Sequence, residues 1–258
     1  MSAEQPLPPI IARMWGRETA ARHGPRPSLE TASVVDAAVA VADAHGLAGV
    51  TMGSVASRLG VAPMSLYRYV GSKDDLLTMM ADAAAPEPPP RGALGWRDYA
   101  VRWTRAQRDH LLRRPWLLDI PRRAAPFGPR ELRWMEGMLA ALEETRLDVG
   151  ECVNIATVLS GYANAQANLA RQLMVPDQGA GASVSRPSYA AALSEVLDPE
   201  EYPILASVAR FDGFGDSGEW IEDADFTFGL DLLCAGVEAL IERLPNESAD
   251  GPATTPAR

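Results

Sequence analysis

The stretch from Thr51 to Leu77 constrains the fold more than any other, because it encodes two short helices joined by a tight turn. Thr51 is the expected N-cap of the first helix, since its hydroxyl can accept a hydrogen bond from a first-turn backbone N–H. Gly60 ends that helix, because glycine adopts the left-handed conformation of a helix C-terminus without strain. Pro63 opens a second helix that runs to Val70. This order predicts a helix-turn-helix, whose second helix enters the major groove of DNA.

The outward side chains of the second helix are suited to contacts with phosphates and base edges. We therefore predict the following DNA-binding set: Thr51, Pro63, Met64, Ser65, Tyr67, Arg68, Tyr69 and Lys73. Lys73 is the only lysine of the chain and lies at the N-terminus of the next helix, which Ser72 caps. The alternative interpretation of Lys73 is a surface residue that makes no DNA contact.

The run Met64–Val70, followed by the run Ser72–Leu77, resembles the recognition helix and the next helix of the tetracycline-repressor (TetR) family. The resemblance covers about Leu29 to Met80. It implies an all-helical, homodimeric transcriptional regulator with an N-terminal DNA-binding domain and a C-terminal ligand-binding domain. It also implies DNA contacts, mostly to phosphates, by the residues at matching positions: Ser65, Tyr67, Tyr69 and Lys73. One position departs from the family pattern, because Gly53 stands where a long polar side chain often reaches the DNA.

The net charge of −10 argues against a DNA partner only if its distribution is ignored. Residues 1–80 carry seven basic and seven acidic side chains, whereas residues 148–258 carry five basic and eighteen acidic ones. The acidic excess therefore belongs to the C-terminal part, where it limits non-specific binding to DNA.

Other classes of function lack the residues they need. Cys152 and Cys234 lie in apolar helical runs, and no CxxC or His/Cys cluster exists, so we expect no metal, no cofactor and no disulfide framework. The sequence has no Ser/His/Asp set or phosphate-binding loop, and we therefore do not expect an enzyme. The N-terminus lacks the apolar region of a signal peptide, and no apolar run of about 18 residues is present. We expect a cytoplasmic protein that does not enter the membrane.

Proline, glycine and charge divide the chain into five predicted segments. Residues 1–27 form a flexible, basic and proline-rich arm, and residues 28–82 form the DNA-binding domain. Residues 83–95 are a stiff, proline-rich linker. Residues 96–244 form a helical ligand-binding and dimerisation domain, and residues 245–258 a disordered tail. Two interpretations of the arm stay open: a disordered tail, or an arm that follows the DNA backbone or enters the minor groove.

The pattern of apolar residues predicts an all-α fold. A first helix is expected at Leu29–His45, before the helix-turn-helix. The expected helices of the larger domain are Trp96–Arg114, Pro129–Thr145, Cys152–Ala170, two short helices within Tyr189–Arg210, and Phe226–Leu244.

Three of these helices carry aromatic, methionine or uncharged polar residues beside their core stripe. We predict that these residues line a cavity for a neutral, largely apolar effector. The predicted ligand-binding residues are Trp103, His110, Trp134, Met138, Thr157, Gly161 and Asn164. The alternative is a filled core, in which case the C-terminal domain would bind a protein partner rather than a small molecule.

The helix Cys152–Ala170 contains no charged residue, and small side chains form a stripe along it. Such a stripe allows a second helix to approach closely. In the TetR family, the corresponding late helices of two subunits form a four-helix dimer interface. On that resemblance we predict the following dimer contacts: Ala156, Ser160, Ala163, Ala167, Ala170, Gly229, Leu233, Gly236 and Leu240. The alternative is an ordinary monomeric core. The resemblance to the TetR family implies a ligand-responsive homodimeric regulator, most often a repressor in that family, that binds a palindromic operator.

Overall fold

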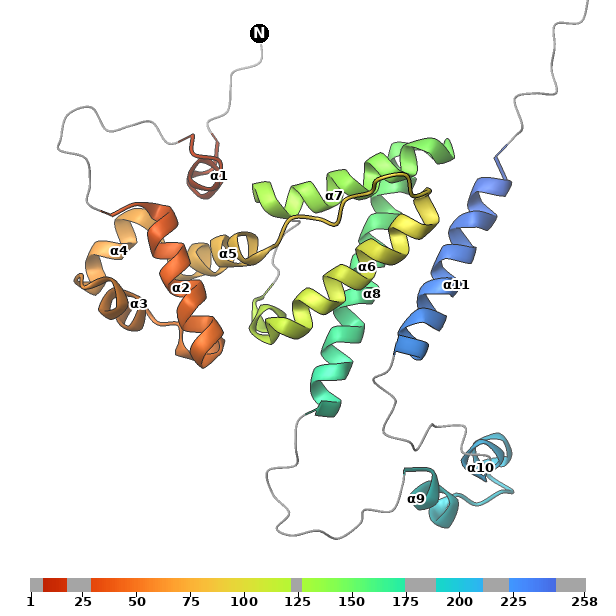
Figure 1. The fold of residues 1–258 in the computed structure, drawn as a ribbon. Helices are drawn as coiled ribbons and strands as arrows, with labels where there is room; N and C mark the ends of the chain where they lie inside the picture. Colours follow the sequence, from red (N-terminus) through yellow and green to blue (C-terminus); the bar gives the residue numbers. More distant parts are fainter. Residues whose placement is uncertain (1–6, 18–28, 122–126, 175–188, 211–222, 245–258) are drawn as a thin grey trace, which may run out of the picture. The chain divides into compact units, whose positions relative to one another are not determined.

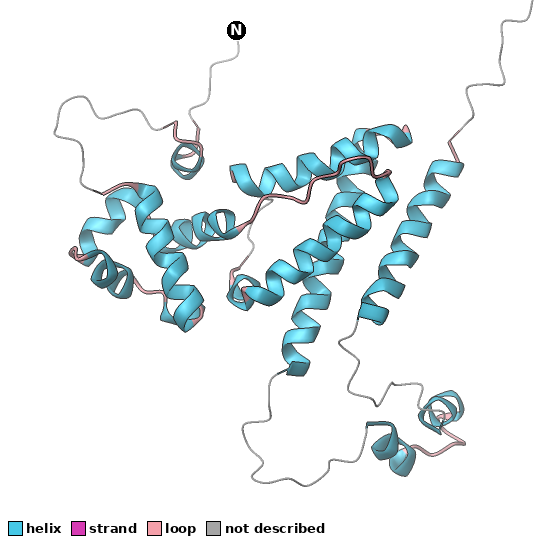
Figure 2. Ribbon diagram, viewed as in Figure 1, coloured by secondary structure: helices cyan, strands magenta, loops and turns pink. Residues whose placement is uncertain are grey.

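The computed structural model describes five ranges: 7–17, 29–121, 127–174, 189–210 and 223–244. Within these ranges all regular structure is helical, as predicted (Figures 1 and 2). The chain forms two compact units. The main unit contains residues 1–168 and 234–258, and the second unit contains residues 169–233.

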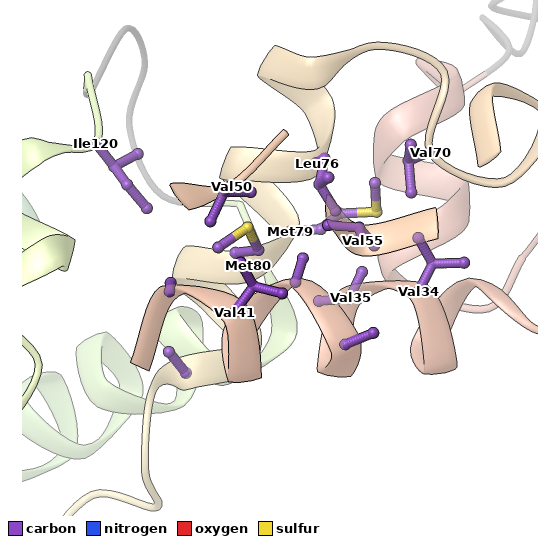
Figure 3. Packing of buried hydrophobic residues seen from close by; sticks show 14 of the residues in the cluster. Val34, Val35, Val41, Val50, Val55, Val70, Leu76, Met79, Met80 and Ile120 are labelled. Carbon is purple, nitrogen blue, oxygen red and sulfur yellow. The ribbon is translucent and has the colours of Figure 1, made fainter. Parts of the chain in front are cut away.

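The DNA-binding part of the main unit consists of four helices: α2 (Thr31–His45), α3 (Met52–Leu59), α4 (Pro63–Val70) and α5 (Lys73–Ala84). Helix α2 packs against the other three. Its Val34 and Ala38 are fully buried with Leu66 of α4 and Leu76 of α5. Figure 3 labels Val34 and Leu76 in this core. Each fully buried valine or leucine side chain contributes roughly 1.5–3 kcal/mol to stability. A short 3-10 turn, η1 (Leu47–Gly49), links α2 to the helix-turn-helix.

Apart from the N-terminal helix described below, the remaining elements of the main unit form the body. They are α6 (Trp96–Arg113), η2 (Pro115–Asp119), α7 (Pro129–Leu142), η3 (Glu143–Thr145), the greater part of α8 (Val149–Met174) and the end of α11 (Asp223–Glu242). The second unit contains the rest of α8 and α11 together with α9 (Tyr189–Val196) and α10 (Pro203–Arg210). The two short helices predicted within Tyr189–Arg210 are present as α9 and α10, and α10 begins at Pro203.

Helices α6 and α7 approach closely at Gly137. A Cβ atom at Gly137 would lie 2.7 Å from the Tyr99 hydroxyl oxygen, so only glycine leaves room for the tyrosine. The hydroxyl of Tyr99 passes this position and donates a hydrogen bond to the carbonyl of Pro89, at 3.1 Å. The close approach therefore connects the proline-rich segment to the body.

The proline-rich segment is held along the body, which differs from the prediction of a linker between two domains. The indole N–H of Trp134 donates to the carbonyl of Pro86 at 2.7 Å, and Arg102 donates to the carbonyl of Pro90 at 3.0 Å. Proline has no backbone N–H group, so each proline of this segment has only its carbonyl to satisfy, with a hydrogen-bond donor. Side chains of α6 and α7 supply those donors.

The N-terminal arm is also more ordered than predicted, because α1 (Pro9–Met14) forms within it. Trp15, directly after this helix, donates its indole N–H to the carbonyl of Phe127 at 2.9 Å. A Cβ atom at Gly71 would lie 2.6 Å from a guanidinium nitrogen of Arg13. Helix α1 therefore lies against the end of α4 and the start of α7. The remainder of the predicted arm and the predicted C-terminal tail lie outside the described residues.

Two carboxylates of the DNA-binding helices bind the body. One oxygen of Asp82, on α5, accepts hydrogen bonds from the backbone N–H groups of Arg130 and Glu131, both at 2.9 Å. It thereby caps the first turn of α7, which has no side-chain cap of its own. Asp43, on α2, accepts from the indole N–H of Trp116 at 2.8 Å. It also pairs with Arg114 at 3.1 Å.

Candidate functional site

The helix-turn-helix is fixed by its local hydrogen bonds. The Thr51 hydroxyl accepts from the backbone N–H of Ser54 at 3.0 Å, and the Ser54 hydroxyl accepts from that of Thr51 at 2.9 Å. This reciprocal capping box starts α3 at the predicted position. Gly60 ends the helix with φ +67°, in the left-handed region. Pro63 then opens α4, as predicted from the sequence.

The outward face of α4 presents side chains to solvent. Met64 is 78 % exposed and Tyr67 is 40 % exposed, while Arg68 is exposed one residue further along. Ser65 is half-buried, and its hydroxyl donates to the carbonyl of Ala62 at 2.6 Å. Lys73 is exposed at the first position of α5. The predicted set, apart from Tyr69, therefore offers aromatic, polar and basic groups that suit a DNA backbone and base edges.

Tyr69 is a correction to the predicted DNA-binding set. Its side chain is only 9 % exposed and packs in the core of the DNA-binding helices. The hydroxyl of Tyr69 accepts a hydrogen bond from Arg68, whose guanidinium carbon lies 4.6 Å from the centre of the Tyr69 ring. A cation held over an aromatic face is stabilised by the charge distribution of the ring. The side chain of Tyr69 is therefore mostly buried, and its hydroxyl holds the guanidinium group of Arg68.

A cavity of about 470 Å³ lies in the body and is lined by residues of α5, α6, α7 and α8; Figure 1 labels these helices. Six of the seven predicted ligand-binding residues line it: Trp103, His110, Trp134, Thr157, Gly161 and Asn164. Thr157 and Gly161 are exposed, so the cavity opens to solvent beside α8. Ala81 and Ala85 bring the helix that follows the recognition helix into the lining. We call this space the effector cavity.

The two tryptophans present their rings, and not their N–H groups, to the effector cavity. The indole N–H of Trp103 donates to the carbonyl of Trp134 at 2.9 Å, and that of Trp134 donates to Pro86. Their ring centres are 5.9 Å apart with planes tilted by 55°. Such tilted pairs are favourable contacts between aromatic rings. The amide N–H₂ of Asn164 donates to the Ser160 carbonyl at 2.8 Å, so hydrogen bonding within α8 also fixes this polar side chain.

Met138 is a second correction, because it is fully buried in the core and does not line the effector cavity. Met135, the residue after Trp134, lines the effector cavity instead of Met138. The sequence prediction also missed Gln107, Glu131 and Leu117. Gln107 lies four residues after Trp103 and so shares its helix face, and the sequence alone could have predicted it. Leu117 lies in the 3-10 turn η2, outside the predicted helices, and helical periodicity could not predict it.

The polar residues of the effector cavity have distinct charge states. Burial, followed by the positive charges of Arg114 and Arg113, lowers the pKa of His110 from 6.5 to about 4. His110 is therefore a neutral imidazole at physiological pH, able to donate or accept a hydrogen bond. Glu131 introduces a carboxyl group, so the predicted uncharged lining requires correction. The remaining wall is mostly apolar, which suits a ligand with a large apolar part.

Two family profiles match this chain. Residues 34–80 match "Bacterial regulatory proteins, tetR family", and residues 87–241 match "Tetracyclin repressor-like, C-terminal domain". The chain belongs to the TetR family. It is thus a transcriptional regulator that binds DNA through its helix-turn-helix, and members of this family are not enzymes.

Several relatives of this TetR-family chain are HTH-type transcriptional regulators from bacteria. It is 32% identical over 241 residues to the HTH-type transcriptional repressor DrrR1 of Streptomyces coeruleorubidus, covering 92% of this chain and 87% of that protein. ActR from Streptomyces coelicolor, in complex with (S)-DNPA, has the same fold with a TM-score of 0.66. The two share 24% identity, over 83% of this chain and 98% of ActR. BioQ with its double-stranded DNA operator matches with a TM-score of 0.54 and 20% identity, over 82% of this chain and 99% of that one.

The interface predicted for this TetR-family chain on α8 needs correction. Ala156, Ala163 and Ala167 are fully buried within their own chain, and Ala170 is nearly so. Ser160 lines the effector cavity. Another chain could not contact these alanines without opening the fold. Periodicity identified the stripe correctly but did not reveal that it faces inward.

A different set of apolar side chains is exposed on the late helices. On α11, Phe228 and Leu232 are 68 % and 59 % exposed, and the predicted residues Gly236 and Leu240 are exposed at the same spacing of four. The other two predicted residues of α11, Gly229 and Leu233, are half-buried. On α8, exposed Val158 and Leu169 lie eleven residues apart and so share one helical face. Among the described residues, no helix has the length and apolar character needed to span a membrane.

Proposed function

We propose that this protein is a homodimeric repressor that binds a palindromic operator and is released by a small, largely apolar effector. The repressor named DrrR1 and the ligand-bound ActR structure support this proposal by analogy. Because its partner is double-stranded DNA, we also propose that the protein acts in the cytoplasm.

The effector cavity is the observation that carries the proposal. It has a volume of about 470 Å³, within the range of small-molecule sites, and its wall is mostly apolar. Its lining includes Ala81 of α5 and Ala85 directly after it. Helix α5 begins at Lys73, beside the recognition helix, so a ligand that shifts α5 would also shift the DNA-binding surface.

The exposed apolar residues support the homodimer. Phe228, Leu232 and Leu240 form a stripe along α11, and Val158 and Leu169 add a second one on α8. Exposed apolar side chains that share one helical face are suited to pack against a second chain. Two copies of the recognition helix in a twofold dimer would match the two halves of a palindrome.

The test uses a labelled inverted repeat from the DNA upstream of the gene and N-phenyl-1-naphthylamine, a neutral fluorescent probe. We expect the wild-type protein to bind the probe and to bind the operator more weakly in its presence. Gly161→Phe should abolish both responses while preserving operator binding. A Cβ atom at Gly161 meets nothing within 4 Å, so the new ring would enter open space. Glu136→Phe is the control, because Glu136 is exposed on α7 and does not line the cavity.

Two results would count against this proposal. If Gly161→Phe bound the probe as well as wild type, the effector cavity would not be the ligand site. If no apolar compound affected operator binding, while a protein captured on the exposed apolar stripes did, the C-terminal part would be a protein-binding domain.

A further inference from the structure

A second hollow, of about 750 Å³, lies where the DNA-binding helices meet the body. Asp43 and Gly46, at the end of α2, line it from the DNA-binding side. The end of α6 and the start of α7 line it from the body. The hollow shares Ala85, Pro86 and His110 with the effector cavity, and the two spaces therefore adjoin.

Three arginines give this second hollow a positive charge. Arg113, Arg114 and Arg130 line it, and Asp43 is the single acidic residue of the lining. We call the hollow the arginine groove. His110, which also lines it, is neutral at physiological pH because of its lowered pKa, so it does not change this balance. The arginine groove therefore carries an excess of two positive charges.

Two of the three arginines are held by backbone carbonyls, and acidic groups compensate part of their charge: Asp43 pairs with Arg114, and Asp82 interacts electrostatically with Arg130. Arg130 donates to the carbonyl of Ala83 at 3.0 Å, and Arg114 donates to the carbonyl of Ala84 at 3.0 Å. A carbonyl orients a guanidinium group without cancelling its charge. Arg113 forms no hydrogen bond or ion pair with any residue that the structure describes. Only Arg114 has an acidic partner in the groove, which is Asp43.

The two adjoining spaces differ in what they can bind. The effector cavity is mostly apolar, and its one carboxyl group, Glu131, would repel an anion. Guanidinium groups offer forked pairs of N–H donors that match the oxygens of carboxylate, sulfonate or phosphate groups. A ligand with an apolar body and one anionic group would therefore place the anion in the arginine groove.

We propose that the arginine groove is an anion subsite and that the effector is an amphipathic organic acid. Its apolar part occupies the effector cavity, and its acid group binds Arg113, Arg114 and Arg130. This inference rests on the proposed function, because it assigns the chemical class of the effector for the same site.

The subsite also suggests how the ligand weakens DNA binding. Arg114 is the residue that pairs with Asp43 of α2, at 3.1 Å. An anion in the groove competes with the Asp43 carboxylate for this guanidinium group. Loss of the pair loosens a contact between the DNA-binding helices and the body, which lets α2 and its neighbours move relative to the body.

The test compares two fluorescent probes on the full-length protein. 1-Anilinonaphthalene-8-sulfonate carries an anionic group that N-phenyl-1-naphthylamine lacks, and the aromatic parts are the same. Arg113→Gln and Arg130→Gln should each weaken sulfonate binding about tenfold, as expected for loss of a charge-assisted pair, while neutral-probe binding stays unchanged. Arg113→Lys, which keeps the charge, should retain most of the affinity. Arg146→Gln, an exposed arginine outside both spaces, serves as the control.

The outcomes separate the two proposals. If the arginine variants weaken both probes equally, or weaken neither, the anion subsite is wrong although the effector cavity can still stand. Binding of the neutral probe without binding of the sulfonate also overturns the subsite. Gly161→Phe should abolish binding of both probes, and if it affects neither, the proposed ligand site itself fails. Circular dichroism and operator binding of every variant check that the fold is intact.

Discussion

Lys73 is exposed at the N-terminus of α5, directly beyond the recognition helix. We expect its ammonium group to bind a DNA phosphate, which contributes affinity without sequence preference. Lys73→Ala should then weaken binding to operator and unrelated DNA alike. It should also reduce the slope of log affinity against log salt concentration by about one. Fluorescence anisotropy at several salt concentrations measures this slope, with Arg146→Ala as the control. An unchanged slope would identify Lys73 as a surface residue only.

His110 makes the stability of the protein depend on pH. Its pKa is lowered from 6.5 to about 4 in the folded protein, mainly by burial. Between these two pH values the unfolded chain binds a proton at His110 that the folded chain does not. His110 therefore makes the free energy of unfolding decrease as the pH falls from about 6.5 to 4. Below pH 4 it causes no further decrease. Urea denaturation at pH 7, 5.5 and 4.5 should reveal a smaller loss in His110→Gln than in wild type. Parallel losses in the two proteins would mean that His110 titrates normally.

At the scale of helices, the cap that Asp82 provides to α7 can be tested by a double-mutant cycle. Asp82→Ala removes the acceptor for two backbone N–H groups and should cost about 1–2 kcal/mol of unfolding free energy. Gly128→Ala should cause a similar loss, because its Cβ atom would lie 2.2 Å from the Asp82 carboxylate oxygen. The two effects should not add, since both remove the same contact.

The control for that cycle is Gly161→Ala, where the Cβ atom meets nothing within 4 Å. This change should be neutral or slightly stabilising, because alanine favours a helix over glycine. Additive losses at Asp82 and Gly128 would indicate that the two residues act through separate contacts.

The helices also illustrate what a sequence can predict. Both ends of α4 match their predicted positions, because Pro63 and the Gly71 that follows Val70 are local signals. Helix α1 was missed, since its order depends on contacts such as that of Trp15 with Phe127, far away in the chain. The inward orientation of Ala163 on α8 was missed for a related reason. A stripe of small residues indicates close packing, but it does not identify the neighbouring helix.

At the scale of the molecule, the sequence predicted six of the fifteen residues that line the effector cavity. Trp103, Trp134 and Asn164 were found because each lies beside the core stripe of its helix. Ala81 and Leu117 could not be found in this way, since they enter the lining only when α5 and η2 pack on the body. The arginine groove depends on the same long-range packing. The spaces between elements are therefore harder to predict than the elements.

The assembly of the whole protein gives the final prediction. If the exposed apolar stripe of α11 forms the dimer interface, a double change of Phe228→Glu and Leu232→Glu would bury two unpaired charges there. The dimer should dissociate in sedimentation experiments, and affinity for the full palindrome should fall far more than affinity for a half-site. Val149→Glu is the control, because Val149 is equally apolar and 78 % exposed, but lies at the first position of α8. An intact dimer in the double variant would place the interface on another surface, whereas dissociation of the control would show that any added charge disrupts assembly.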